Sequence, residues 1–166
     1  MSKRNAVVST VVAAASLLAP ISLGQAREPA ADAINGLAGR WAGAGTFTPA
    51  KGPSQQFKCV VTYIQARDGN DLNQNLRCHA DGYRLEAATQ LVIKGKQVTG
   101  RWEDKINALS GDVYGLVTKD GFDIQLQGRF FQANMVVVSS DCRQSVTVTP
   151  ARTDYIRELQ AQLTKC

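Results

Sequence analysis

The residue types that most often perform chemistry are few and widely spaced in this chain. It has one histidine, His79, and one adjacent pair of carboxylates, Glu103 and Asp104. Neighbouring residues of a strand point to opposite faces, so these carboxylates cannot work together as acid and base. No Cys-X-X-Cys pair accompanies the histidine, so a zinc site is not expected. The sequence therefore predicts no catalytic residues, no metal site and no cofactor.

The cysteines favour disulfide chemistry instead. There are four of them: Cys59, Cys78, Cys142 and Cys166. An even number in an exported chain favours disulfides, here with three connectivities. Asp68-Gly69 predicts a tight two-residue hairpin turn, in which opposed residues have numbers that sum to 137.

Cys59 and Cys78 meet this condition, so we expect a disulfide between them. Directly opposed Cα atoms lie roughly 4.5–5.5 Å apart, a distance that a disulfide bridges. A two-residue loop makes them a hydrogen-bonded pair, and a four-residue loop makes them a non-hydrogen-bonded pair. For Cys142 and Cys166 we expect a second bridge, with a free terminal thiol or a disulfide-linked dimer as alternatives.

The same register predicts which face of the sheet is dry. Cys59 shares its face with Phe57 and Tyr63, whereas His79 pairs with Lys58 on the polar face. His79 is therefore expected to be an ordinary surface histidine.

Alternating apolar and polar residues recur about every dozen positions, which is typical of a meandering antiparallel sheet. The predicted strands are 39–48, 57–66, 70–80, 83–94, 97–105, 109–118, 122–128, 130–139, 143–149 and 156–164. The last also fits a helix, but a strand is favoured because it covers an open sheet edge. The expected fold class is all-β, a single antiparallel up-and-down barrel of about 8–10 strands.

Three of these strands contain a similar phrase. The phrases are Gly39-Arg40-Trp41, Gly100-Arg101-Trp102 and Gly128-Arg129-Phe130. The aromatic and the arginine point to opposite faces, so the aromatic enters the barrel. Core packing with barrel curvature is favoured, and a ligand pocket floored by tryptophans is the alternative.

Gly39-Arg40-Trp41 resembles the G-x-W of the lipocalins and wider calycins. The whole mature chain is similar to small exported proteins of alphaproteobacteria. They share G-R-W-x-G, a C-x-V-T-Y strand (59–63), an L-x-x-N-L-R-C strand (72–78) and R-Q-S-V (143–146). These resemblances imply a calycin-like barrel and no particular activity.

Residues 1–26 have the features of a signal peptide: Lys3 and Arg4, an apolar run, and small residues before Ala26. Residues 27–38 are then a loose or briefly helical lead-in, and 39–166 form the barrel domain. The 19 basic and 14 acidic residues give a net charge of +5, and losing Lys3 and Arg4 lowers it to +3. The basic residues are scattered, so nucleic acid is not an expected partner. We expect a periplasmic or secreted protein with no stable membrane insertion.

The function expected from the sequence is binding of a small apolar or amphipathic ligand without catalysis. The residues expected to bind it are Trp41, Phe57, Tyr63, Leu91 and Trp102. Inner glycines such as Gly43, Gly45, Gly111 and Gly115 are expected to leave room for it. The alternative is a structural or inhibitor-like envelope protein with a solid core and a protein partner, bound through the lead-in or through 48–56.

Overall fold

A computed structural model of the chain describes residues 29–66, 69–152 and 156–166. These residues form one helix, α1 (Pro29–Leu37), followed by ten strands. The strands are β1 (Gly39–Pro49), β2 (Gln55–Gln65), β3 (Asp71–Ala80), β4 (Tyr83–Lys94), β5 (Gln97–Asp104), β6 (Leu109–Val117), β7 (Gly121–Gly128), β8 (Gln132–Ser140), β9 (Arg143–Arg152) and β10 (Ile156–Thr164). All ten predicted strands are present, with ends shifted by at most a few residues. The expected signal peptide and Asp68 lie outside the described residues.

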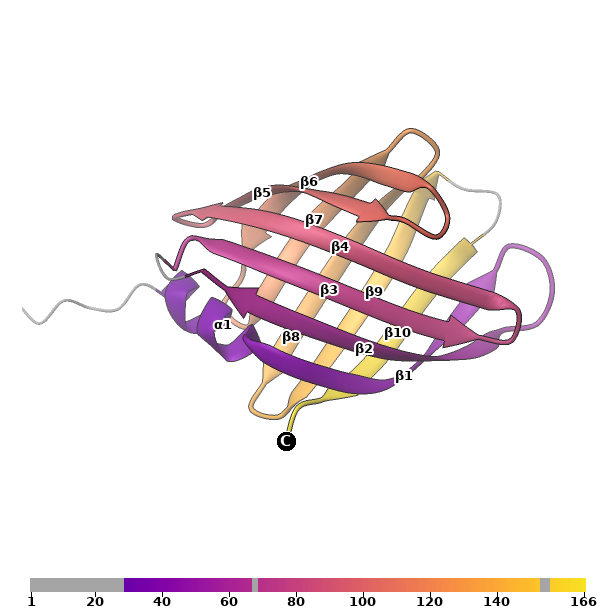
Figure 1. Cartoon of the computed structure of the whole chain (residues 1–166), viewed down its shortest axis with the longest axis horizontal. Helices are drawn as coiled ribbons and strands as arrows, with labels where there is room; N and C mark the ends of the chain where they lie inside the picture. The colour runs from indigo at the N-terminus through magenta and orange to yellow at the C-terminus, as the bar shows by residue number, and fades with distance from the viewer. Residues whose placement is uncertain (1–28, 67–68, 153–155) are drawn as a thin grey trace, which may run out of the picture.

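Each strand pairs antiparallel with its chain neighbours, and β1 pairs with β10 to close the barrel (Figure 1). This confirms the all-β, up-and-down architecture. The segment from 156 to 164 is a strand and not a helix, because it bonds to β1 on one side and β9 on the other. Closure removes both sheet edges, which would otherwise be open to pairing with other chains.

The β2–β3 register is the one expected from the sequence, with Cys59 opposite Cys78 and Lys58 opposite His79. Ala66 N donates to Asp71 O at 2.8 Å, so Ala66 and Asp71 form a hydrogen-bonded pair. Hydrogen-bonded and non-hydrogen-bonded pairs alternate along an antiparallel ladder, and Cys59 lies an odd number of residues before Ala66. Cys59 and Cys78 therefore form a non-hydrogen-bonded pair, and their Cα atoms are 4.1 Å apart. The connection is thus longer than the two-residue turn that Asp68-Gly69 predicts.

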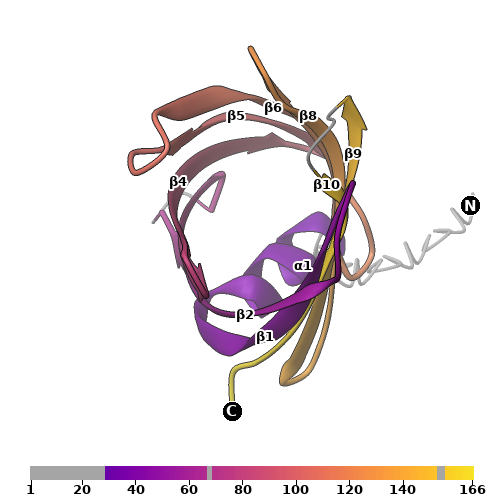
Figure 2. The ribbon, with the colours of Figure 1, turned by 90° about the vertical axis from the view of Figure 1, so that its right-hand side faces the viewer.

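Helix α1 lies across one end of the barrel (Figure 1) and is seen through the barrel from the opposite end (Figure 2). Its buried residues Ile34 and Leu37 belong to the barrel core, and it contacts β2, β7 and β8. Trp41, the first inward residue of β1, is fully buried, and its Nε1 donates to Leu37 O at 2.8 Å. The lead-in is thus a plug that covers the core residues at this end.

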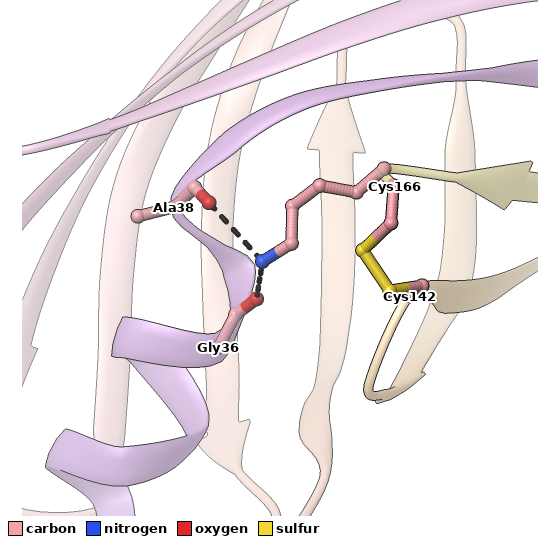
Figure 3. The surroundings of a disulfide bond; sticks show 5 residues. Gly36, Ala38, Cys142 and Cys166 are labelled. Atoms are coloured by element: carbon pink, nitrogen blue, oxygen red, sulfur yellow. Dashed lines mark hydrogen bonds between the residues drawn. A yellow bond between two sulfur atoms is a disulfide. The ribbon is translucent and has the colours of Figure 1, made fainter.

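The C-terminal residues fasten this plug (Figure 3). Cys166 forms a disulfide with Cys142, in the turn between β8 and β9. Lys165 Nζ donates to Gly36 O at 2.9 Å and to Ala38 O at 3.4 Å, where α1 ends. The same ammonium lies 4.8 Å from the centre of the Trp41 ring, within range of a cation–π interaction. The positive charge of Lys165 therefore lies at the C-terminal end of α1, where the helix dipole favours a cation.

Candidate functional site

The barrel contains a cavity of about 240 Å³, which extends along β2 and β10 as far as Val61 and Leu163, beside the first residues of β1. Its walls are made by inward residues of strands β2 to β10, together with Phe131 from the β7–β8 connection. The lining residues are Phe57, Cys59, Val61, Tyr63, Gln74, Leu76, Cys78, Tyr83, Leu85, Ala87, Thr89, Trp102, Asp104, Leu109, Leu126, Phe131, Met135, Val137, Val146, Val148, Ile156, Leu159, Ala161 and Leu163. The Cys59–Cys78 bridge is part of this wall.

The cavity stops where the next inward residues pack the barrel solidly. Leu72, Leu91, Val113 and Ile124 are buried and do not line it. We call the buried residues near α1 that do not line the cavity the filled half of the barrel, and the lining residues the hollow half, although on β2 the lining extends to Val61, opposite Trp41. The residues listed above define the hollow half.

Three of the five residues expected to bind a ligand lie together in this lining: Phe57, Tyr63 and Trp102. The other two, Trp41 and Leu91, do not line the cavity and are buried in the filled half. The sequence prediction grouped Trp41 and Leu91 with the other three residues because all five point into the barrel. It did not anticipate that α1 covers one end of the barrel and that inward residues near this helix pack in the core.

The inner glycines do not create the cavity, contrary to expectation. A Cβ atom at Gly45 would lie 2.3 Å from the Phe57 ring, and one at Gly111 would lie 2.7 Å from Trp102 Nε1. At these two glycines, and at Gly43 and Gly115, the nearest atom is a backbone oxygen of the neighbouring strand. These glycines permit close approach of rings and backbones, so the space above them is occupied.

A hydrogen-bonded group joins β2 to β9 inside the barrel. The Tyr63 hydroxyl donates to Gln144 Oε1 at 3.4 Å, and Gln144 Nε2 donates to Ser139 Oγ at 3.0 Å. Burial raises the pKa of the Tyr63 phenol well above the ordinary value, and the neighbouring Gln144 and Gln74 side chains oppose this rise. Tyr63 and Gln74 line the cavity, so this group is a polar part of its inner surface.

A second polar area lies on β4 and β5. Buried Thr89 is directly opposite Trp102, and Asp104 follows two residues later on the same face. The Asp104 side chain is almost fully buried, with 1% exposed, and it accepts hydrogen bonds from Ile106 N at 3.0 Å and from the Asn107 side chain. It therefore organises the β5–β6 connection from inside the barrel.

Trp102 differs from Tyr63 and Asp104, because its indole N–H is buried and has no hydrogen-bond partner among the described residues. Its ring lies over Gly111 and Gly128 and meets Phe131 edge-on, with ring centres 6.1 Å apart. A buried donor without an acceptor is costly and rare in folded proteins.

Apolar residues are exposed around the end away from α1, here called the mouth. Tyr83, Ile106 and Phe130 follow or lie in the β3–β4, β5–β6 and β7–β8 connections, and Phe130 is 74% exposed. The prediction that Phe130 enters the barrel is therefore wrong, because β7 ends at Gly128, before this residue. Arg129 lies over the Phe130 ring at 5.1 Å. Burial, and secondarily the nearby Asp104, raises the pKa of Tyr83. An apolar molecule entering the cavity would pass these side chains.

The remaining chemistry-bearing residues are not brought together. His79 is exposed on the outer face, as expected, in a shallow hollow beside Tyr83 and Arg84. Within residues 29–66, 69–152 and 156–166, no three or more His, Cys, Asp or Glu side chains are grouped to hold a metal ion. The described helix is too short to cross a membrane.

The architecture is shared with known barrels. The structure is similar to an S-type phycobiliprotein lyase, CPES, from Guillardia theta, with a TM-score of 0.61 at 7% identity, covering 81% of this chain and 91% of that one. It is also similar to Rv2717c from M. tuberculosis, with a TM-score of 0.67 at 16% identity, covering 83% and 98%. No protein-family model and no curated protein matches the chain. At these identities the likeness concerns the fold, and it confirms the expected calycin-like barrel.

Proposed function

We propose that this chain is an exported binding protein whose hollow half holds a small apolar molecule, without catalysis. The observation that carries the proposal is the 240 Å³ cavity, whose lining is mostly apolar with a few polar groups. Such a composition is typical of ligand sites. An engineered apolar cavity of about 150 Å³ binds benzene, so this one has room for a molecule of one or two rings.

The residues around the cavity support a binding site rather than a packing defect. At the α1 end, Ile34, Leu37 and Trp41 are almost completely buried and belong to the core. The other end is hollow, and its disulfide, Cys59–Cys78, fixes part of the wall. The apolar mouth residues give an entering apolar molecule a favourable surface.

The binding test uses two leucine substitutions on the same strand. Ala87 lines the cavity, whereas Ala88 is its neighbour on the other face of β4. Calorimetric titration with α-methylstyrene should give binding with a negative heat-capacity change in the wild type and in Ala88→Leu. Ala87→Leu should lose it, because the added side chain occupies the space. Absence of binding by every one-ring and two-ring aromatic hydrocarbon up to naphthalene would overturn the proposal.

Export is a separate part of the proposal. It is supported by the basic start, the apolar run and the two disulfides, which persist in oxidising compartments. Expression of the full chain in a Gram-negative bacterium should yield periplasmic protein that begins at Arg27. Recovery of the uncleaved chain in the cytoplasm, with free thiols, would contradict it.

A further inference from the structure

Large apolar side chains extend into solvent from the connections at the mouth. Tyr83, Ile106 and Phe130 are 50%, 48% and 74% exposed, and they follow or lie in three different connections. These connections all lie at the end of the barrel opposite α1 (Figure 1). Among the described residues, no other large apolar side chain is as exposed as Phe130. An apolar surface left exposed at one end of a molecule is typical of an interaction site.

The three connections are neighbours around the rim of the mouth. The Asn107 side chain donates to Arg84 O at 3.2 Å, which joins the β5–β6 connection to the start of β4, beside Tyr83. Strand β6 then pairs with β7 up to Gly128, so the β7–β8 connection, which contains Phe130, comes next around the barrel. The exposed apolar residues of the mouth are therefore presented side by side.

Exposed apolar residues on the outer wall are arranged differently. Leu116 lies directly between Gln97 and Asp123 of the two adjacent strands. Val92 is likewise directly opposite Asp71. Each of these wall residues is thus flanked by polar side chains, as single apolar residues on a protein surface commonly are.

Basic side chains accompany the apolar ones at the mouth. The four described connections there contain Lys51, Lys105 and Arg129, all exposed, and one acidic residue, Asp81. Lys105 pairs with Glu103 at 3.4 Å. Within the described part of the chain, neither Lys51 nor Arg129 has an acidic partner. The rim therefore has unpaired positive charge beside its apolar side chains.

A row of basic residues continues this charge along the outer wall next to the mouth. Lys58, His79 and Arg84 are directly opposite one another on β2, β3 and β4, and all three are exposed. Basic residues in such a row repel one another when charged. None of the three forms an ion pair with an acidic side chain of the described residues. An anion outside the chain would offset the repulsion, so the row favours an anionic partner.

A lipid surface fits this mixture of side chains better than a protein does. The core of a protein interface is apolar and depleted of lysine and other charged residues. The surface of a bilayer instead accepts aromatic rings at the level of the headgroups, with Lys and Arg beside the lipid phosphates. Arg129 lies 5.1 Å from the centre of the Phe130 ring, so a cation and an exposed ring are presented together.

We propose that the mouth docks on anionic membrane surfaces. Phe130, Ile106 and Tyr83 enter the headgroup region, the basic side chains of the rim lie against lipid phosphates, and the barrel itself stays outside the hydrocarbon. The inference goes beyond the proposed function, because docking does not require an occupied cavity. It places the entrance of the cavity against a membrane, into which apolar molecules partition from water.

Vesicle flotation tests the docking. The chain from Arg27 onward contains the whole described barrel and omits the apolar N-terminal run, which would itself bind lipid. This protein should bind vesicles of phosphatidylglycerol at least about tenfold more tightly than vesicles of phosphatidylcholine, and added salt should weaken the binding. Absence of binding to phosphatidylglycerol vesicles, or equal binding to both lipids, would overturn the proposal.

Matched substitutions at the two ends of the barrel test which end docks. Phe130→Ser should weaken binding to phosphatidylglycerol at least about tenfold, because it removes a ring from the interface. Arg84→Gln should weaken it about fivefold, the scale of one basic residue near an anionic surface. The controls are Leu116→Ser, at a residue that is 53% exposed, and Lys119→Gln in the β6–β7 turn, both at the α1 end. Equal losses in the controls would overturn the assignment to the mouth.

A third measurement reports contact with lipid directly. Phe130→Trp and Leu116→Trp each add one indole, at the mouth and at the α1 end, to the same background of Trp41 and Trp102. Phosphatidylglycerol with brominated acyl chains should quench the added emission in Phe130→Trp and not in Leu116→Trp. The reverse pattern would contradict the proposed orientation.

Two further outcomes separate this inference from its alternatives. A dimer that Phe130→Ser dissociates, without vesicle binding by the wild type, would assign the mouth to a second copy of the chain and overturn docking on lipid. The titration with α-methylstyrene is made without vesicles, so failure of that ligand to bind would count against the proposed function and leave the docking result unaffected.

Discussion

Trp41 and Trp102 follow the same Gly-Arg dipeptide, yet they lie in opposite halves of the barrel. Trp41 is fully buried, its N–H is bonded to α1, and Lys165 covers its ring. Trp102 lines a cavity, and its N–H is unpaired among the described residues. The same short motif thus packs against a helix in one strand and borders a cavity in another. What differs is the plug, which covers only one end.

The largest expected effect is a difference in the free energy of unfolding between substitutions of the two tryptophans. Trp41→Ala should lower the free energy of unfolding by about 4 kcal/mol, the scale for a large buried aromatic. Trp102→Ala should cost at most about half of this, because its ring already borders an empty space. Urea unfolding of both variants, followed by circular dichroism, provides the measurement. Equal losses would contradict the division into filled and hollow halves.

The two disulfides make the next comparison. Their sequence separations are 19 and 24 residues, so removing either should cost roughly 3 kcal/mol by the loop-entropy estimate. Cys59→Ala/Cys78→Ala should also change the affinity for α-methylstyrene, because this bridge is in the cavity wall. Cys142→Ser/Cys166→Ser should leave that affinity unchanged. Altered binding in the second variant alone would contradict the independence of the two halves.

A smaller effect is expected from the lysine that fastens the plug. Lys165→Met removes two hydrogen bonds to the end of α1 and the contact with the Trp41 ring. The expected loss is about 1 kcal/mol, together with faster amide exchange in α1. Lys119→Met, in the β6–β7 turn at the same end, serves as a control for the lost charge. Equal effects of the two substitutions would contradict a specific role for Lys165.

The smallest effect is confined to alkaline pH and concerns Tyr63. Its phenol, with an ordinary pKa of 10.0, holds its proton more tightly in the folded barrel than in the unfolded chain. The folded state therefore retains a proton that the unfolded state loses above about pH 10, and stability falls as pH rises further. Tyr63→Phe should show a shallower decline above pH 10 and the same pH dependence as the wild type below pH 9. Parallel profiles throughout would contradict the burial of the phenol.

Much of the barrel could be predicted because its information is local. Alternation located ten strands, and the centre of one turn fixed the Cys59–Cys78 register. The cavity could not be located in the same way, since alternation reports the face of a residue and not its depth along the barrel. Trp41 and Leu91 were grouped with Trp102 for this reason.

The position of a residue along the barrel axis depends on contacts between segments that are distant in the sequence. The plug depends on Ile34 and Leu37 packing into the barrel, and on Lys165 returning to α1 from the other end of the chain. The segment 29–37 has only a short apolar pattern, which does not indicate where it packs. Asp104 was likewise set aside with Glu103, although its inward position follows from counting two residues on from Trp102.

The Cys142–Cys166 bridge has a practical consequence for handling the protein. It holds the last residue of the chain beside the plug, at the end opposite the mouth (Figures 1 and 3). A sensor surface or a fusion partner joined after Cys166 would therefore leave the mouth facing outward into solution. Small molecules could then reach an immobilised layer of this barrel without obstruction by the attachment.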